Sequence, residues 1–162
     1  MRKVTPLQAA TPVQEATATP SPETAGYQHV FNITLSIRWG DMDAFGHVNN
    51  TVYFRYMEQL RIEWLESIGL PLPEGQGPVL ASTSMNFRKQ LHYPGRLLLS
   101  LLAKPPGRSS IDTRFEIRRE DDAEQHIYAD GGATIVWVDF AKAKSTGLPE
   151  AIRGLLPRPE GV

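Results

Sequence analysis

Hydrophobic and polar residues alternate strictly in the first part of the chain that carries a regular pattern, just after Tyr27. Every second residue is apolar: Phe31, Ile33, Leu35, Ile37 and Trp39. Asparagine, threonine, serine and arginine fill the positions between them. A period of two residues is typical of a strand with one buried face. We therefore expect a half-buried strand that runs through Trp39.

The pattern changes to a helical period after Asn50. Apolar residues then recur at steps of three or four residues: Tyr53, Met57, Leu60, Trp64 and Ile68. They form one stripe of a helix, and further apolar neighbours widen it, so the helix must be covered over much of its girth. Asn49 and Asn50 are favourable N-cap residues, and Gly69 followed by Pro71 predicts the C-terminal end.

Strand patterns dominate the rest of the chain. We expect strands over residues 79–93, 96–104, 109–120 and 125–140, separated by turns rich in proline, glycine or aspartate. Gly131-Gly132 predicts a bulge or sharp bend inside the last strand. Strands joined by short turns pair antiparallel, so the sequence predicts an α+β fold with a five-stranded antiparallel sheet curled around one long helix. The edge strands of such a sheet invite a partner subunit.

The first 26 residues differ from the remainder. They are rich in threonine, alanine and proline and contain no aromatic residue. Such a segment buries too little apolar surface to offset its chain entropy. We expect residues 1–26 to form a flexible tail and residues 27–162 to form one domain. A targeting peptide is the alternative, which Glu15, Glu23 and the scarcity of basic residues disfavour.

Composition narrows the class of protein. Seventeen lysines and arginines against 18 aspartates and glutamates give the 162 residues a net charge of −1. This balance argues against a surface devoted to nucleic acid or to an anionic membrane. The lack of cysteine excludes disulfides, thiolate metal sites and a cysteine nucleophile. With no long apolar run and no export signal, we expect a cytoplasmic protein.

The candidate chemistry lies in the loop before the helix, residues 40–49. Asp41, Asp43 and His47 precede a helix N-terminus, where unpaired N–H groups favour negative charge. Such an end can hold a carbonyl oxygen that becomes negative during acyl transfer, while a nearby carboxylate attacks or activates water. Taken singly, these aspartates are more often turn formers or helix caps. Asp-x-Asp beside a histidine could also bind a metal, and spacing alone leaves these alternatives open.

The string from Asp41 to Asn50, Asp-Met-Asp-Ala-Phe-Gly-His-Val-Asn-Asn, is followed by Tyr53 and Phe54 in the expected helix. It resembles the signature of hotdog-fold thioesterases of the 4-hydroxybenzoyl-CoA thioesterase type. The resemblance covers residues 31–157 and agrees with the expected order of elements. It implies a hotdog fold and hydrolysis of an acyl-CoA thioester with neither metal nor cofactor. By the same resemblance, Asp43 is the catalytic carboxylate and the backbone N–H of Asn50 polarises the thioester carbonyl.

The resemblance implies further roles and a partner. His47 and Asn49 would shape the site, and Asp41 would brace the loop. The site would lie at a subunit interface in a homodimer or homotetramer. Family members differ over whether the carboxylate attacks the carbonyl or activates water. The enzyme that names the family has bulky apolar or aromatic residues where this chain has His47, Asn49 and Asn50, so the reaction transfers more safely than the aryl substrate.

Charge distribution gives separate support for a CoA ester. Residues 86–119 hold eight basic and two acidic residues, a local charge of +6. The phosphates of CoA need arginine and lysine near the mouth of a site, which makes Arg88 and Lys89 candidate substrate-binding residues. The same residues could form a solvated sheet face or meet an acidic acyl carrier protein. An acyl-carrier-protein thioesterase and a non-catalytic acyl-CoA-binding protein are therefore the alternative functions.

Overall fold

The computed structural model describes residues 24–69 and 74–158. Its strands are β1 (Gln28–Ser36), β2 (Gln76–Phe87), β3 (Arg96–Ala103), β4 (Ser110–Arg119), β5 (Ala129–Asp139) and the short β6 (Lys144–Ser145). Its helices are the 3-10 turn η2 (Trp39–Asp41), the long α1 (Asn50–Ser67) and the short α2 (Glu150–Arg153).

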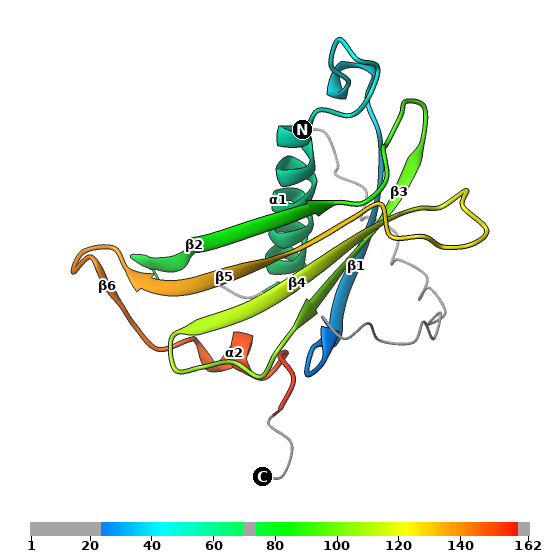
Figure 1. The fold of residues 1–162 in the computed structure, drawn as a ribbon. Helices are drawn as coiled ribbons and strands as arrows, with labels where there is room; N and C mark the ends of the chain where they lie inside the picture. Colours follow the sequence, from blue (N-terminus) through cyan, green and yellow to red (C-terminus); the bar gives the residue numbers. More distant parts are fainter. Residues whose placement is uncertain (1–23, 70–73, 159–162) are drawn as a thin grey trace, which may run out of the picture.

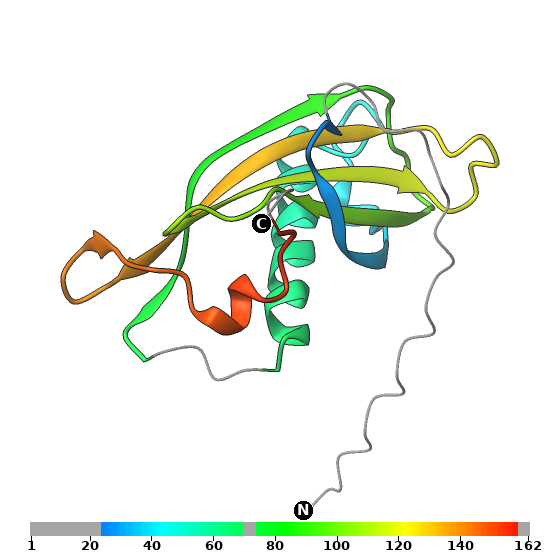
Figure 2. The same ribbon diagram turned by 90° about the horizontal axis from the view of Figure 1, so that it is seen from below.

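The five main strands form one antiparallel sheet in the order β1-β3-β4-β5-β2, and β6 pairs with β5. Helix α1 lies against one face of this sheet (Figure 1). A second view shows the sheet arching over the helix (Figure 2). The predicted α+β hotdog fold is therefore confirmed.

Helix α1 follows the predicted pattern closely. Its buried residues are Tyr53, Tyr56, Met57, Leu60 and Trp64. Asn49 is the N-cap, and its side chain accepts a hydrogen bond from the backbone of Thr51. Gly69 follows the helix with a φ of 62°, a left-handed conformation that glycine adopts without strain. The wide apolar stripe of α1 packs against the sheet, which explains why this helix lies at the centre of the fold.

The five predicted strands correspond in order to β1–β5 but differ at their ends, and the short β6 was not predicted. The predicted first strand included Trp39 in its buried face, and this is wrong: β1 ends at Ser36, and Trp39 begins η2 with 75% of its surface exposed. The second predicted strand, residues 79–93, was placed too late in the chain. The observed strand, β2, spans Gln76–Phe87. Residues 88–95 instead form a loop that packs against the segment before α1.

Of the two possibilities predicted at Gly131-Gly132, a bulge or a sharp bend, the bulge is wrong. Both glycines pair with β2 and β4 in continuous register, and the shift in the β2–β5 pairing lies between Leu80 and Ser82. The reason for glycine is close packing. A Cβ on Gly131 would overlap the carbonyl oxygen of Ser84 and lie 2.6 Å from Cζ of Phe115.

The segment after β5 was not predicted to have regular structure, yet it completes the core. Helix α2 and its flanks bury Leu148, Ile152 and Leu156. In Figure 2 this segment lies beside α1, below the arch of the sheet. Of the predicted tail, residues 1–23 lie outside the described residues, and 24–26 form a turn in which Thr24 is buried. Among the described residues, α1 is too polar to cross a membrane, and α2 is too short.

We predict that Gly131→Ala destabilises the protein by about 1–3 kcal/mol or more, because the added methyl has no space in the sheet. Gly132→Ala is the matched control, since its Cβ would come no closer than 3.6 Å to Thr113 O. Urea denaturation of the two variants measures the difference. Equal free energies of unfolding would show that close packing at Gly131 is not the constraint.

Candidate active site

The loop between η2 and α1 is held in shape by its own backbone. Met42 and Val48 form an isolated antiparallel bridge. Inside it, Asp43 N donates to His47 O at 2.9 Å and Gly46 N donates to Asp43 O at 3.0 Å. Gly46 has a φ of 77°, which permits this tight turn. These backbone hydrogen bonds therefore fix the part of the loop that carries Asp43 and His47.

Asp41 ties this loop to the central helix. Its Oδ2 accepts hydrogen bonds from Arg38 N and from the hydroxyl of Tyr56, both at 2.7 Å. Burial raises the pKa of Tyr56, and the hydrogen bond to the Asp41 carboxylate raises it further, so the hydroxyl stays protonated and donates. The carbonyl of Asp41 also accepts from Asn49 N at 2.9 Å. Asp41 thus joins η2, α1 and the residue that caps α1.

The first amides of α1 are satisfied unequally. The side chain of Asn49 accepts from Thr51 N at 2.9 Å and from Thr51 Oγ1 at 2.7 Å, and its carbonyl accepts from Val52 N at 2.9 Å. Within residues 24–69 and 74–158, the amide of Asn50 has no hydrogen-bond partner. One N–H at the positive end of the helix dipole is therefore available to an acceptor from outside.

Asp43 fits two of the interpretations that its spacing left open, a turn-forming residue and a carboxylate available for chemistry. Its Oδ1 accepts from Phe45 N at 2.9 Å, so the residue does form an Asx turn. In the described part of the chain, Oδ2 has no hydrogen bond. The turn fixes the direction of the carboxylate and leaves one oxygen for a ligand or for water.

An open cavity of about 520 Å³ lies where this loop meets the start of α1. Five predicted site residues line it: Asp43, His47, Asn50, Arg88 and Lys89. The sixth, Asn49, serves instead as the cap of α1. The structure thus brings residues more than 35 positions apart to one place.

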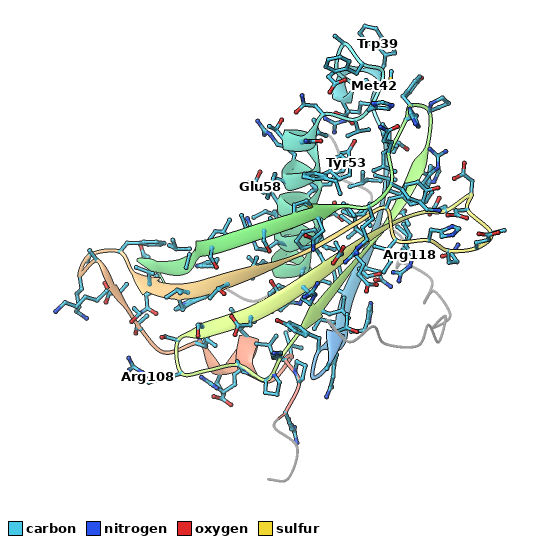
Figure 3. The ribbon with its side chains drawn as sticks, viewed as in Figure 1. Trp39, Met42, Tyr53, Glu58, Arg108 and Arg118 are labelled. Atoms are coloured by element: carbon cyan, nitrogen blue, oxygen red, sulfur yellow. The ribbon has the colours of Figure 1, made fainter. Side chains whose placement is uncertain are left out.

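Aromatic residues that the sequence did not single out for the site form the apolar part of this cavity. Tyr53 and Phe87 meet edge to face with ring centres 5.1 Å apart. Phe45 also lines the cavity and is 85% exposed. Figure 3 shows Tyr53 on the first turns of α1, below the loop that carries Met42 and Trp39. Tyr53 belonged to the predicted core stripe, and no pattern linked Phe87 to it.

The second side of the cavity is the loop at residues 88–95. Its Leu91 carbonyl accepts from Val48 N at 2.9 Å, and the ring of His92 packs against that of His47 with centres 4.8 Å apart. Arg119 donates to His92 O at 3.2 Å and to Pro94 O at 3.3 Å. The end of β4 therefore supports the loop.

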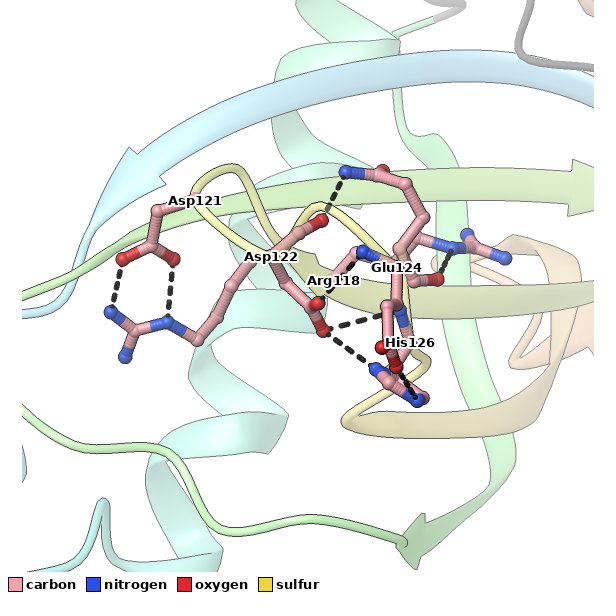
Figure 4. A network of polar contacts seen from close by, with 7 residues as sticks. Arg118, Asp121, Asp122, Glu124 and His126 are labelled. Atoms are coloured by element: carbon pink, nitrogen blue, oxygen red, sulfur yellow. Dashed lines mark hydrogen bonds and ion pairs between the residues drawn. The ribbon is translucent and has the colours of Figure 1, made fainter.

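The hairpin between β4 and β5 is itself held by a network of polar contacts (Figure 4). Asp121 accepts two hydrogen bonds from Arg119, both at 2.7 Å. His126 lies between Asp122 and Glu124, 3.0 Å from each. Throughout the described residues, histidines and carboxylates are not grouped in a way that would hold a metal ion.

These observations define a class of protein. A family model described as the thioesterase-like superfamily matches residues 37–156. The chain belongs to this superfamily. The matched segment begins just before the loop described above and ends in the segment that closes the core.

Individual relatives agree with this assignment. A protein of Pseudomonas aeruginosa, provisionally described as a thioesterase, is 35% identical; the match covers 78% of this chain and 98% of that chain with a TM-score of 0.73. A Xanthomonas campestris protein, provisionally described as an acyl-CoA thioesterase, is 32% identical over 74% of this chain and 98% of its own, with a TM-score of 0.65. An acyl-acyl carrier protein thioesterase of Arabidopsis thaliana chloroplasts is 30% identical over 79% of this chain and 68% of its own.

We predict that Tyr56 and Asp41 are energetically coupled by about 1.5–3 kcal/mol, the range for a hydrogen bond to a charged group. The variants Tyr56→Phe and Asp41→Ala and their combination form a double-mutant cycle. Urea denaturation gives the free energy of unfolding of each. Additive effects of the two substitutions would show that this bond does not anchor the loop.

Proposed function

We propose that this chain hydrolyses acyl-CoA thioesters to a free acid and CoA. The observation that carries the proposal is the Asn50 amide, which has no hydrogen-bond partner in the described chain and lies in the same cavity as Asp43. Membership of the thioesterase-like superfamily supports the same reaction. The motif also supports a narrower assignment, to the 4-hydroxybenzoyl-CoA thioesterase type.

The proposed chemistry uses one carboxylate and one amide. The thioester carbonyl oxygen accepts a hydrogen bond from Asn50 N–H, which stabilises the negative charge that develops on that oxygen. Oδ2 of Asp43 takes a proton from water, and the water oxygen bonds to the carbonyl carbon. As the tetrahedral intermediate collapses, the C–S bond breaks and the thiolate takes the proton from Asp43. In the alternative route, Oδ2 attacks the carbon directly, the C–S bond breaks, and CoA leaves as a thiolate that is then protonated. Water hydrolyses the resulting acyl anhydride to the free acid and the Asp43 carboxylate.

The neighbouring residues then have defined tasks. His47 and the aromatic rings of Tyr53 and Phe87 border the acyl group, because they line the cavity next to Asp43. Arg88 and Lys89 supply positive charge at the same cavity for the phosphates of the substrate. Asn49 acts indirectly, since it satisfies Thr51 and leaves the Asn50 amide to the substrate.

An acyl carrier protein is the second candidate substrate. The specific observation in its favour is the 30% identity to a plant acyl-acyl carrier protein thioesterase. A carrier protein and CoA present the thioester on the same phosphopantetheine arm, so the chemistry at Asp43 is unchanged. Assays with the same acyl group on both carriers compare the two directly.

We predict that Asp43→Asn lowers kcat/KM by about 100- to 10,000-fold, the usual range for loss of a general base. Asparagine keeps an oxygen acceptor for Phe45 N, so the turn survives and only the charge is lost. A thiol-trapping dye measures turnover of short, long and aromatic acyl-CoAs. Asp41→Asn is the matched control, because Asp41 ends η2 two residues before Asp43 and does not line the cavity, and we expect less than a tenfold effect.

Two outcomes would contradict the proposal. Hydrolysis by Asp43→Asn at the parental rate would remove the carboxylate from the mechanism. Binding of acyl-CoA by the parent protein without turnover of either carrier would instead identify a non-catalytic binding protein.

We also propose that two or four copies assemble with the cavity at an interface. Strand β2 is an edge of the sheet, and three of its apolar residues, Val79, Leu80 and Phe87, are each about 40% exposed or more. Such a row on an unpaired edge is typical of a subunit contact.

Light scattering after gel filtration is expected to give a mass of two or four chains of 18.1 kDa. Val79→Lys with Leu80→Lys would lower that mass if the β2 edge forms the contact. A parent protein of monomeric mass would contradict this part of the proposal.

A further inference from the structure

A buried carboxylate lies outside the cavity on the other face of the sheet. Asp130, at the start of β5, is 4% exposed. It accepts hydrogen bonds from Nε and Nη2 of Arg88, the latter at 3.2 Å, and from Nη2 of Arg114 at 3.0 Å. Nδ2 of Asn86 lies 3.5 Å away. A single carboxylate therefore joins side chains from β2, β4 and β5.

The sheet register explains why these groups meet. Asp130 pairs with Asn86 of β2 and with Glu116 of β4. Its neighbours in sequence, Ala129 and Gly131, face the core with Phe115 and Ile117. Because side chains alternate across a strand, Asp130 and its partners lie on the face away from α1. Arg88, two residues after Asn86 and just beyond the end of β2, contacts Asp130 on the same face.

The contacts hold Arg88 more firmly than is usual for an arginine at the surface. Burial alone would raise the pKa of Asp130, but the hydrogen bonds from Arg88, Asn86 and Arg114 outweigh it and keep the pKa below its ordinary value. The two contacts from Arg88 fix the plane of its guanidinium. Arg88 N also donates to Tyr128 O at 2.9 Å. Even so, the Arg88 side chain remains 45% exposed, compared with 18% for Arg114.

We propose that Asp130 is a positioning residue that fixes Arg88 at the cavity rim to bind a phosphate of the phosphopantetheine carrier. The inference rests on the proposed function and adds to it the residue that orders the phosphate contact. The thioester lies inside the cavity beside Asp43, and the arm runs past the end of β2 to the outer face. A planar guanidinium held in advance loses less entropy when it binds phosphate than one that is free to rotate.

The competing explanation is that Asp130 only ties three strands together. The two roles differ in which substrates they affect. A structural role predicts that Asp130→Asn affects all thioesters equally, through stability. A positioning role predicts an effect restricted to substrates that carry phosphate, and a change in KM rather than in kcat.

The test compares one acyl group on three carriers: CoA, an acyl carrier protein with its phosphopantetheine arm, and N-acetylcysteamine, which lacks phosphate. Arg88→Gln should raise KM for acyl-CoA about tenfold, the effect of losing one charge-assisted contact. Asp130→Asn leaves the guanidinium present but not held, and should raise that KM about fivefold. Both variants should change kcat, and KM for the N-acetylcysteamine thioester, less than twofold.

Glu116→Gln is the matched control. Glu116 lies on the same face, next to Asp130, and forms its own ion pair with Arg118 at 2.6 Å. It should change KM for acyl-CoA less than twofold. A rise in KM with both phosphate carriers places the pantetheine phosphate at Arg88, and a rise with CoA alone places a nucleotide phosphate there.

Two results would overturn the inference. One is an equal effect of Asp130→Asn on all three carriers. The other is an unchanged or lower KM for acyl-CoA, which would mean that the contact with Asp130 does not help Arg88 to bind phosphate. If the parent protein hydrolyses none of the thioesters, the proposed function fails instead. Calorimetry with CoA and with pantetheine then tests Asp130 separately, since only CoA binding should weaken in Asp130→Asn.

Discussion

The amides in the first turn of a helix have no carbonyl partner within the helix, so each needs an acceptor from elsewhere. In this protein the partners come from the residues just before the helix. Asn49 satisfies two of these amides, and Asp41 satisfies that of Asn49 itself. The Asn50 amide alone among these neighbours keeps its hydrogen free in the described chain. The candidate site is therefore built around the one amide at this helix end that the described residues leave without an acceptor.

This arrangement makes the site depend on distant parts of the fold. The loop with Asp43 is fixed to α1 through Tyr56 and to the 88–95 loop through Leu91. The 88–95 loop is fixed in turn by Arg119 at the end of β4. Rigid elements on three sides therefore hold a short loop whose own sequence is rich in turn-forming residues. Such support is what a preorganised amide and carboxylate require.

The sequence predicts two parts of the structure well. These are the helix and strands with a regular hydrophobic period, and the site residues that lie within the short motif from Asp41 to Asn50. The stripe from Tyr53 to Trp64 predicts α1 because every step of three or four residues faces the sheet. Trp39 was misplaced because the alternation continues past Ser36, where the contact of Asp41 with Arg38 N has already turned the chain. The core role of α2 was missed, since only three apolar residues, Leu148, Ile152 and Leu156, recur at spacings of four, which is a weak signal.

Contacts between distant residues were the least predictable part of the site. Arg88 could be chosen for its charge, but its partner Asp130 lies 42 positions away, beside a pair of glycines. The pairing follows only from the register of β2, β4 and β5. The meeting of Phe87 with Tyr53 has the same origin, because it needs the end of β2 to lie against the first turns of α1.

The most direct test of the account replaces Asn50 by proline and, in parallel, by alanine. Asn50 is the first residue of α1, where proline fits a helix, and Asn49 has the extended conformation that proline requires before it. Proline removes the N–H, whereas alanine removes only the side chain. The account predicts that Asn50→Pro lowers kcat for an acyl-CoA about 100- to 1,000-fold while Asn50→Ala stays near the parent, with similar melting temperatures. Parental kcat in a folded Asn50→Pro protein would contradict it.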